Sequence, residues 1–451
     1  MNHSEELGTK PIGNLLRAQA IPASVGILIM SIYGIVDTIF VGRWVGTLGI
    51  GAITVVLPIT FLISSIGMSI GIGGASVISR ALGSGNRERA LLTFGNQATL
   101  TLILAVGIVL IGSFFQESIL RTFGGRGDIL PYAKEYFQII LLGIPFLAWA
   151  MMTNNVIRSE GAAKFAMMIM IVPAVMNMIL DPILIGWFDM GISGAAWATT
   201  FSYMASAAFS LWYFFKGPSG LKLKVKNLSL KRDVVKEIFS IGIITLIRQG
   251  TISLLAIFLN NALFSYGGEM GVSVYGIINR VMMFANFPVL GVTHGFLPIA
   301  GYNFGAQKWD RVKEVIFQAI IFGTGIAFII FLGIMFFAKE ISALFTNDSD
   351  LIALSTPAIM TVFLATPTLT IQLIGSAYFQ SIGKAVPALL LTMLKQGFFL
   401  IPLILILPAF FDLNGVWYAF PIADILTALV NLWFIRMALR QLSVPLTPDI
   451  A

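Results

Sequence analysis

The chain has 451 residues, of which 57% are hydrophobic and only 11% charged, and its formal net charge is +7. Soluble domains carry about 25% charged residues. This composition, with a mean hydropathy of +0.91, therefore excludes a soluble globular enzyme and predicts an all-α polytopic membrane protein embedded in a lipid bilayer. The chain has no cysteine, which excludes disulfides and cysteine-ligated metals. Its basic residues lie in short connections and not on one domain face, so no nucleic acid partner is expected.

Apolar windows of about 20 residues predict membrane-spanning helices. We expect twelve, over residues 15–42, 48–80, 92–115, 131–157, 164–187, 192–215, 233–264, 271–303, 313–337, 351–379, 386–409 and 414–438. The connections are short and leave no room for a soluble domain. The longest connection, 216–232, is rich in lysine.

The distribution of lysine and arginine predicts the orientation of the chain. Twenty of the 28 basic residues fall in connections on the side of the N-terminus, five fall on the opposite side and three within spans. Basic residues are enriched in cytoplasmic loops. We therefore expect a multi-pass protein of the cytoplasmic (inner) membrane with both termini in the cytoplasm.

The chain repeats itself at a constant offset. The segment Arg80–Arg89 matches Tyr302–Arg311, and Arg158–Gly161 matches Gln380–Gly383 with the same separation along the chain. Six helices therefore repeat as six, which predicts two lobes related by a pseudo-twofold axis along the membrane normal. We expect an N-lobe over 1–215, a basic cytoplasmic linker over 216–232 and a C-lobe over 233–451.

The first predicted span contains an acid at a position where a charge is energetically unfavourable. Asp37 is the only ionisable side chain of acidic or basic type between Arg17 and Arg43, and a charge at the bilayer centre costs about 2.5–3.5 kcal/mol. Our central hypothesis is that Asp37 binds and releases the proton that drives transport. A buried structural hydrogen bond is the alternative. Tyr33 lies one turn earlier on the same face. Pro22 removes a helix hydrogen bond, which makes it either a conformational hinge or a static kink.

The fifth span places Pro173, Asn177 and Asp181 on one helical stripe. Asn177 and Asp181 are expected to take part in proton or cation coupling, with a solvated carboxylate near the outer end of the helix as the alternative for Asp181. At the offset of the repeat, Asp37 aligns with about Asn260 and Asp181 with about Leu403, so the acids belong to the N-terminal half alone. Further candidates for substrate contact are Met30, Tyr136, Met151, Asn154, Met178 and Thr199. Methionines suit a surface that accepts many shapes, but they also fill gaps between helices.

Three basic residues, Arg248, Arg280 and Lys395, fall within the second half. A lipid or lipid-linked sugar flippase would need a basic lumen, and Arg248 and Lys395 keep that alternative open. An intramembrane enzyme with an Asp37–Asp181 dyad is a further alternative, without a recognisable catalytic motif. The sequence contains no phosphate-binding loop and no H-E-x-x-H motif, so neither a nucleotide cofactor nor a metal site is expected.

These residues resemble the multidrug and toxic compound extrusion (MATE) transporters, with the DNA-damage-inducible (DinF) branch most similar. The resemblance is carried by the six-plus-six helices, the Val36–Gly42 segment, the loop Arg80–Gly83 with its counterpart after the eighth helix, and Asn177 with Asp181. It implies a V-shaped, monomeric two-lobe antiporter that exports small organic cations and amphiphilic drugs. It also implies an N-lobe site at Asp37, Tyr33, Tyr136, Asn154, Asn177, Asp181 and Thr199. Asn260 stands where the sodium-coupled branch has an acid, which favours protons and leaves sodium possible.

Overall fold

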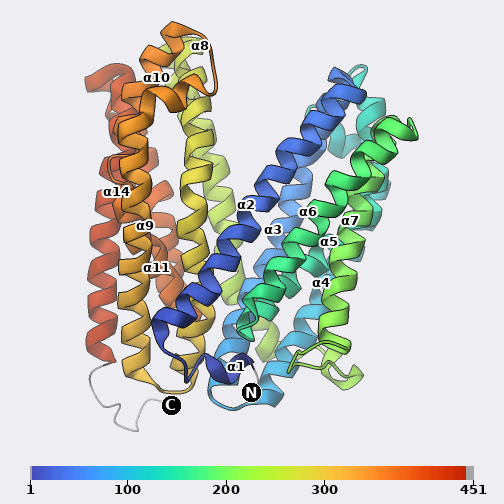
Figure 1. Ribbon diagram of the computed structural model, residues 1–451, viewed down its shortest axis with the longest axis vertical. Coiled ribbons are helices and arrows are strands. Elements are labelled where there is room, and N and C mark those ends of the chain that lie inside the picture. Colours follow the sequence, from blue (N-terminus) through green and yellow to red (C-terminus); the bar gives the residue numbers. More distant parts are fainter. Residues whose placement is uncertain (1–2, 443–451) are drawn as a thin grey trace. The chain divides into compact units, whose positions relative to one another are not determined.

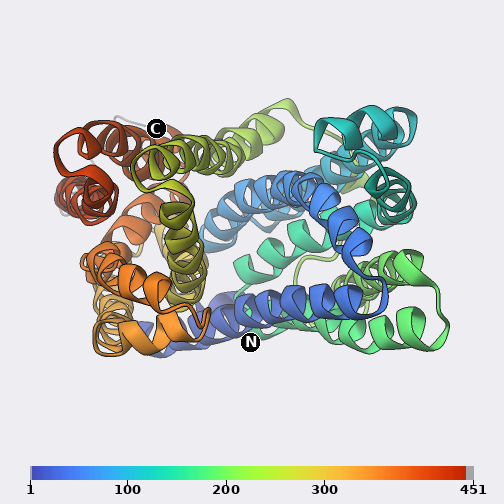
Figure 2. The same ribbon diagram turned by 90° about the horizontal axis from the view of Figure 1, so that it is seen from above.

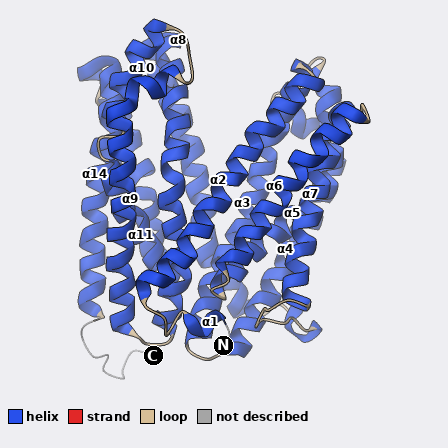
Figure 3. Ribbon diagram, in the orientation of Figure 1, coloured by secondary structure: helices blue, strands red, loops and turns tan. Residues whose placement is uncertain are grey.

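The computed structural model describes residues 3–442, and in this range it contains helices and no strand (Figure 3). The helices are α1 (His3–Glu6), α2 (Ile12–Trp44), α3 (Thr47–Gly83), α4 (Arg87–Thr122), α5 (Ile129–Ser159), α6 (Ala163–Asp181), η1 (Pro182–Trp187), α7 (Gly191–Phe215), η2 (Val225–Leu228), α8 (Arg232–Gly305), α9 (Trp309–Ala343), α10 (Ser349–Val362), η3 (Thr366–Thr368), α11 (Leu369–Ser381), α12 (Ala385–Met393), η4 (Leu394–Leu400), α13 (Ile401–Ile406) and α14 (Pro408–Gln441). The predicted all-α class is confirmed.

Ten helical segments of the described chain are long and apolar enough to cross a membrane. One of them, α8, has 74 residues and contains two of the predicted spans, separated at Gly268. The backbone of Gly268 has φ +58, a conformation that glycine adopts without the steric penalty of a Cβ. The sixth predicted span corresponds to α7, which falls outside the ten. With α8 counted as two spans and α7 included, the helices correspond to the twelve predicted from the sequence.

The chain (Figure 1) divides into two compact units, and two of the three boundaries between them, at Ser24 and at Leu246, fall inside helices. Unit 1 holds the chain up to Leu7 together with Val25–Leu246, and unit 2 holds Gly8–Ser24 together with the chain from Ile247 onward. Each unit contains most of one predicted lobe. The first part of α2, however, groups with unit 2, and the linker with the first part of α8 groups with unit 1.

In unit 1, glycines allow the start of α8 and the helix α3 to approach at backbone distance. A Cβ added at Gly73 would lie 2.1 Å from the carbonyl oxygen of Ile238 and 3.1 Å from the nitrogen of Gly242. Small residues at such interfaces are the usual means by which membrane helices pack closely. The same helix α3 meets α5 at Gly67, where a Cβ would lie 3.0 Å from the carbonyl oxygen of Ala148.

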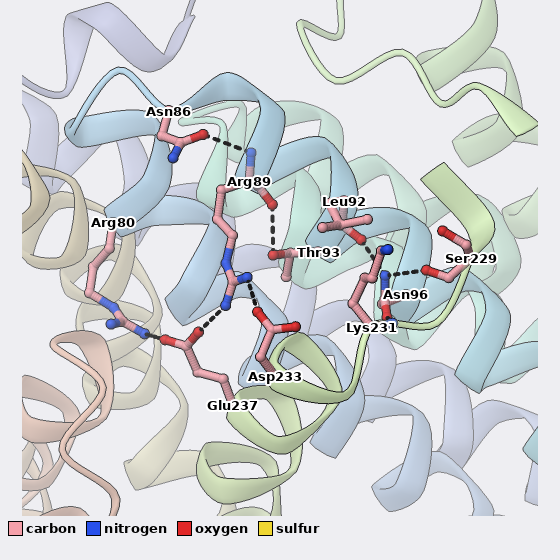
Figure 4. Close-up of polar contacts among 10 residues, drawn as sticks. All are labelled: Arg80, Asn86, Arg89, Leu92, Thr93, Asn96, Ser229, Lys231, Asp233 and Glu237. Carbon is pink, nitrogen blue, oxygen red and sulfur yellow. Dashed lines mark hydrogen bonds and ion pairs between the residues drawn. The ribbon is translucent and has the colours of Figure 1, made fainter. Parts of the chain in front are cut away.

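The linker is bound along unit 1 and is not a loose tether. The amide of Asn96 donates to the carbonyl oxygen of Ser229 at 3.1 Å and accepts from the backbone nitrogen of Lys231 at 2.8 Å (Figure 4). Two arginines then hold the first turns of α8. Arg89 pairs with Asp233 and, at 2.9 Å, with Glu237, which also accepts from Arg80 at 2.8 Å. The beginning of α8 is thereby fixed to the α3–α4 turn of its own unit.

The beginning of the linker is held by a buried carboxylate. Glu160, directly after α5, accepts hydrogen bonds from the Ser219 hydroxyl at 2.9 Å and from the backbone nitrogens of Gly220 at 2.8 Å and Leu221 at 3.1 Å. Only 5% of Glu160 is exposed. Three donors from one turn of the linker therefore converge on one acid of unit 1.

Unit 2 repeats this arrangement at the same offset as the sequence repeat. Gly295 is the counterpart of Gly73, and a Cβ there would lie 2.8 Å from the nitrogen of Ala20. Arg311 is the counterpart of Arg89, and it donates to the carbonyl oxygen of Lys10 at 2.7 Å, just ahead of α2. Figure 2 shows α14 and α9, the red and orange helices of this unit, from above. The sequence repeat is therefore also a repeat of packing, in which each unit binds the start of a long helix.

Candidate functional site

Two buried carboxyl groups meet inside unit 1. Asp37 lies on α2 and is 9% exposed, and Asp181 is the last residue of α6 and is fully buried. The two side chains interact directly with one another. The alternative of a solvated Asp181 is therefore wrong.

A contact between two carboxyl groups is a hydrogen bond only when one of them carries a proton. Asp37 Oδ1 and Asp181 Oδ2 are buried and have no hydrogen-bond partner among residues 3–442. Two like charges 4 Å apart repel by about 4 kcal/mol at an effective dielectric constant of about 20. The pair is thus suited to hold one proton between two acids.

Asn177 and Thr199 complete the polar part of the site. The Asn177 amide nitrogen donates to Asp181 Oδ1 at 3.4 Å and to the Thr199 hydroxyl of α7 at 3.3 Å. Asn177 precedes Asp181 by one helical turn, so both face the same side of α6. The helix then changes to the π-helical segment η1, which begins at Pro182. Such segments are frequent at functional sites.

Three tyrosines surround the acids. Tyr33 of α2 and Tyr136 of α5 both lie close enough to Asp37 to interact with its charge, and Tyr136 also reaches Thr199. Tyr203 of α7 interacts with Tyr33 and with Asp37, and the sequence interpretation did not include it. Tyr203 follows Thr199 by four residues, so the same one-turn spacing used for α2 and α6 would have identified it.

The other candidate residues make their contacts with groups other than Asp37 and Asp181. Asn154 donates to the carbonyl oxygen of Ala166 at 2.6 Å and accepts from Arg158 at 3.0 Å, which ties α5 to the start of α6. Met151 packs against Gly67. The side chains of Met30 and Met178 are half-buried, as expected of residues that border a site without bonding to it. Pro22 is buried in the part of α2 that belongs to unit 2.

The chemistry available at this site is the binding of one positive charge. Within the described chain, the ion pairs do not include Asp37 or Asp181, so no arginine or lysine neutralises them. A proton satisfies the pair, and a monovalent organic cation between aromatic side chains would satisfy it equally. The tyrosines supply both aromatic faces and hydroxyl groups next to the acids.

Comparison with known proteins identifies a family. The family model MatE matches residues 22–183 and again 244–406, so the second matched segment begins where the sequence repeat places the counterpart of the first. The multidrug export protein MepA of Staphylococcus aureus (strain MSSA476) is 29% identical over 441 residues and covers 96% of each chain. MepA of Staphylococcus saprophyticus subsp. saprophyticus is 28% identical over 432 residues, 94% of each chain.

Solved structures give the same result. A MATE transporter structure described as the bent conformation has a TM-score of 0.91 and 26% identity, and covers 98% of each chain. A structure described as the straight conformation has the same score and identity, and covers 97% of this chain and 98% of that chain. These neighbours confirm the expected two-lobe fold of twelve helices. The DinF branch stays a prediction. With both halves matched by the family model, the chain belongs to the MatE family and is a multi-pass membrane transporter, not an enzyme.

Proposed function

We propose that this protein exports organic cations and amphiphilic drugs across the cytoplasmic membrane in exchange for protons. Both termini lie in the cytoplasm, and the protein acts as a monomer. The observation that carries the proposal is the pair of buried, uncompensated acids Asp37 and Asp181, framed by tyrosines. The export of drugs by the MepA relatives, which their names record, supports the substrate class.

Proton and drug compete for one negative charge in this mechanism. When the pair holds its proton, the site is neutral and a cation gains little by entering. When the proton leaves, the remaining carboxylate attracts a cation more strongly than it would in water because the surroundings are apolar. Exchange of one proton for one monovalent cation moves no net charge, so the pH gradient alone drives it. A neutral drug would also draw on the membrane potential, about 2.3 kcal/mol per charge per 100 mV.

Alternating access requires two conformations that the two ligands stabilise differently. We assign the hinge to Pro22. Its position close to Ser24–Val25, where α2 passes from unit 2 to unit 1, supports this assignment. Proline cannot donate the backbone hydrogen bond that would stiffen the helix there. The bent and straight structures of the MATE neighbours support a change of shape of this kind. Asp37 lies on the same helix, so its protonation state acts directly on the hinge helix.

The test is transport of a fluorescent organic cation into proteoliposomes under an imposed pH gradient, with and without sodium. We expect uptake with a pH gradient in the absence of sodium, and its loss in Asp37→Asn and in Asp181→Asn. Asp189→Asn is the matched control, because Asp189 is an exposed acid in the connection after η1 and should transport as the parent does. All variants are first checked for monodispersity after purification.

Two results would overturn the proposal. Full transport by Asp37→Asn would remove the acid pair from the mechanism. Transport driven by a sodium gradient at zero pH difference would replace the proton as coupling ion, while the family assignment would stand.

A further inference from the structure

The linker and the first turn of α8 carry a dense positive charge that the proposed transport does not use. Between residues 216 and 236 the sequence has seven basic residues and one acid, Asp233, and Asp233 is already paired with Arg89 of α4. All seven basic side chains are exposed, and the ion pairs among the described residues include none of them: Lys216, Lys222, Lys224, Lys226, Lys231, Arg232 and Lys236. This stretch therefore offers its charge to a partner outside the chain.

The linker has an inner side and an outer side. On the inner side Leu221 is fully buried, and the carbonyl oxygen of Asn227 lies so close to Gly95 of α4 that a Cβ at Gly95 would not fit. On the outer side the lysines alternate with exposed apolar side chains, namely Val225 at 85%, Leu228 at 40% and Leu230 at 46% exposed. Single exposed apolar residues are ordinary on a protein surface, but apolar residues interleaved with lysines are typical of segments that lie in a membrane interface.

The linker reaches the level at which the apolar surface of α4 begins. The Thr99 hydroxyl donates to the carbonyl oxygen of Leu228 at 2.8 Å, and Thr99 lies about 18 Å along α4 from the first residue of that helix. One turn further on, Leu102 and Ile103 are 59% and 54% exposed, as expected of side chains that face lipid. Trp212, in the last turn of α7, is 47% exposed, and tryptophan is enriched where a membrane meets water. The outer side of the linker therefore lies at the edge of the bilayer.

Anionic phospholipid is the partner that fits both the charge and the apolar side chains. Clusters of lysine and arginine next to a membrane span attract anionic headgroups, and each basic residue near the surface strengthens binding roughly fivefold. A nucleic acid or an acidic protein would neutralise the lysines but would leave Val225 in water. The linker is also held in place by Asn96 and Glu160, so lipid binding requires little further ordering of the chain.

We propose that the outer side of the linker is a binding site for anionic phospholipids of the adjoining leaflet. Lys222, Lys224 and Lys226 bind the headgroup phosphates, and Val225 enters the apolar layer beneath them. The lipid is a bound partner and not a transported substrate. The site is separate from the acid pair of α2 and α6, so its test requires no proton gradient and does not depend on the proposed function.

The test uses the absence of cysteine from the chain, because Val225→Cys then gives a single position for an environment-sensitive dye. The labelled full-length protein in a neutral detergent is titrated with dioctanoyl phosphatidylglycerol and, separately, with dioctanoyl phosphatidylcholine. We expect the dye emission to shift to the blue, and phosphatidylglycerol to bind roughly tenfold more tightly than phosphatidylcholine. Leu344→Cys is the matched label control, because Leu344 is an apolar residue that is 81% exposed but lies outside the linker; its dye should not respond.

Charge variants of the Val225→Cys protein identify the residues that bind. Changing Lys222, Lys224 and Lys226 together to Gln should reduce the lipid preference to less than about threefold, and changing the same three to Arg should keep it. The matched control changes three exposed basic residues of unit 2 to Gln and should keep the preference: Lys384, Arg436 and Arg440.

Three results would overturn the proposal. The first is equal binding of the two lipids. The second is a preference that survives the change of the three linker lysines to Gln, or that is lost equally in the unit 2 control. The third is displacement of the lipid by inorganic phosphate or by polyglutamate, which would assign the lysines to a free anion or to an acidic protein.

Discussion

Gly73 offers the most quantitative test of how the start of α8 is held. An alanine Cβ at this position would lie 2.1 Å from the Ile238 carbonyl oxygen, whereas carbon and oxygen atoms in ordinary close contact are about 3.3 Å apart. The first turns of α8 must then move away from α3 by roughly 1 Å to restore that contact distance. Both partners are backbone atoms that no side-chain rotation can move aside.

The cost follows from general values for overpacked interiors. Forced displacement of a packed segment costs about 1–3 kcal/mol, and alanine gains about 1 kcal/mol over glycine as a helix former. We therefore expect Gly73→Ala to lower the free energy of unfolding by up to about 2 kcal/mol, measured by thermal unfolding in detergent. Hydrogen exchange should rise over residues 232–246, because these are the residues displaced.

The matched control is Gly107→Ala on α4, where a Cβ would have no neighbour within 4 Å. This variant gains the helix propensity without the displacement, so it should be as stable as the parent or slightly more so. The reasoning is refuted if Gly73→Ala is as stable as Gly107→Ala and hydrogen exchange over 232–246 is unchanged.

Three further predictions concern the linker and the hinge. Burial raises the pKa of Glu160 to about 7 from its ordinary 4.5. At a pH between these two values, the folded chain therefore holds a proton on Glu160 that the unfolded chain has released. The free energy of unfolding falls as pH rises through this interval. Glu160→Gln should remove this slope, a difference on the order of 3 kcal/mol, in denaturation midpoints measured from pH 4.5 to 8. Asn96→Ala leaves the partners at Ser229 and Lys231 unpaired, which costs about 1–3 kcal/mol and should show as faster hydrogen exchange over 228–231; unchanged exchange would contradict the bound linker. Pro22→Ala should restore a helix hydrogen bond, keep cation binding and slow transport several-fold; transport at the parental rate would remove Pro22 as the hinge.

The spans and the repeat were predictable because each leaves a local signal. Apolar runs of membrane length fix the helices, and the twelve predicted spans all correspond to observed helical segments. The break within α8 at Gly268 coincides with the polar gap between the spans 233–264 and 271–303. The repeat of packing could also be read from the sequence, because Gly73 and Gly295 are separated by the same offset as Arg80 and Tyr302.

The exchange of helix starts between the units was not predictable from the same signals. A continuous helix gives no sign in its sequence of the residue at which its packing partner changes, and the boundaries at Ser24 and Leu246 lie inside the continuous helices α2 and α8. The binding of the linker to unit 1 was not predictable for another reason. Asn96 holds it through backbone atoms, and two of the three donors to Glu160 are backbone nitrogens. Backbone groups of this kind leave no signal in the sequence of a linker.

At the candidate site, the sequence predicted which residues share one face of a helix, but it did not predict which residues of different helices touch. The stripe of Asn177 and Asp181 follows from a one-turn spacing. That Asp37 faces Asp181 depends on the packing of α2 against α6. The family resemblance put both acids in one N-lobe site, but the spacing of residues along the chain gave no sign that they touch. Asn154 shared the polarity expected of a site residue, but it bonds to Ala166 and Arg158 instead.

The competition between proton and drug at the acid pair is tested most directly by counting protons on cation binding. Purified protein in weakly buffered detergent solution, just below the pH at which the pair loses its shared proton, is titrated with a saturating monovalent organic cation while a pH indicator is read. The account predicts release of about one proton for each cation bound, and no release from the double variant Asp37→Asn with Asp181→Asn. Cation binding without proton release, or equal release from the double variant, would contradict it.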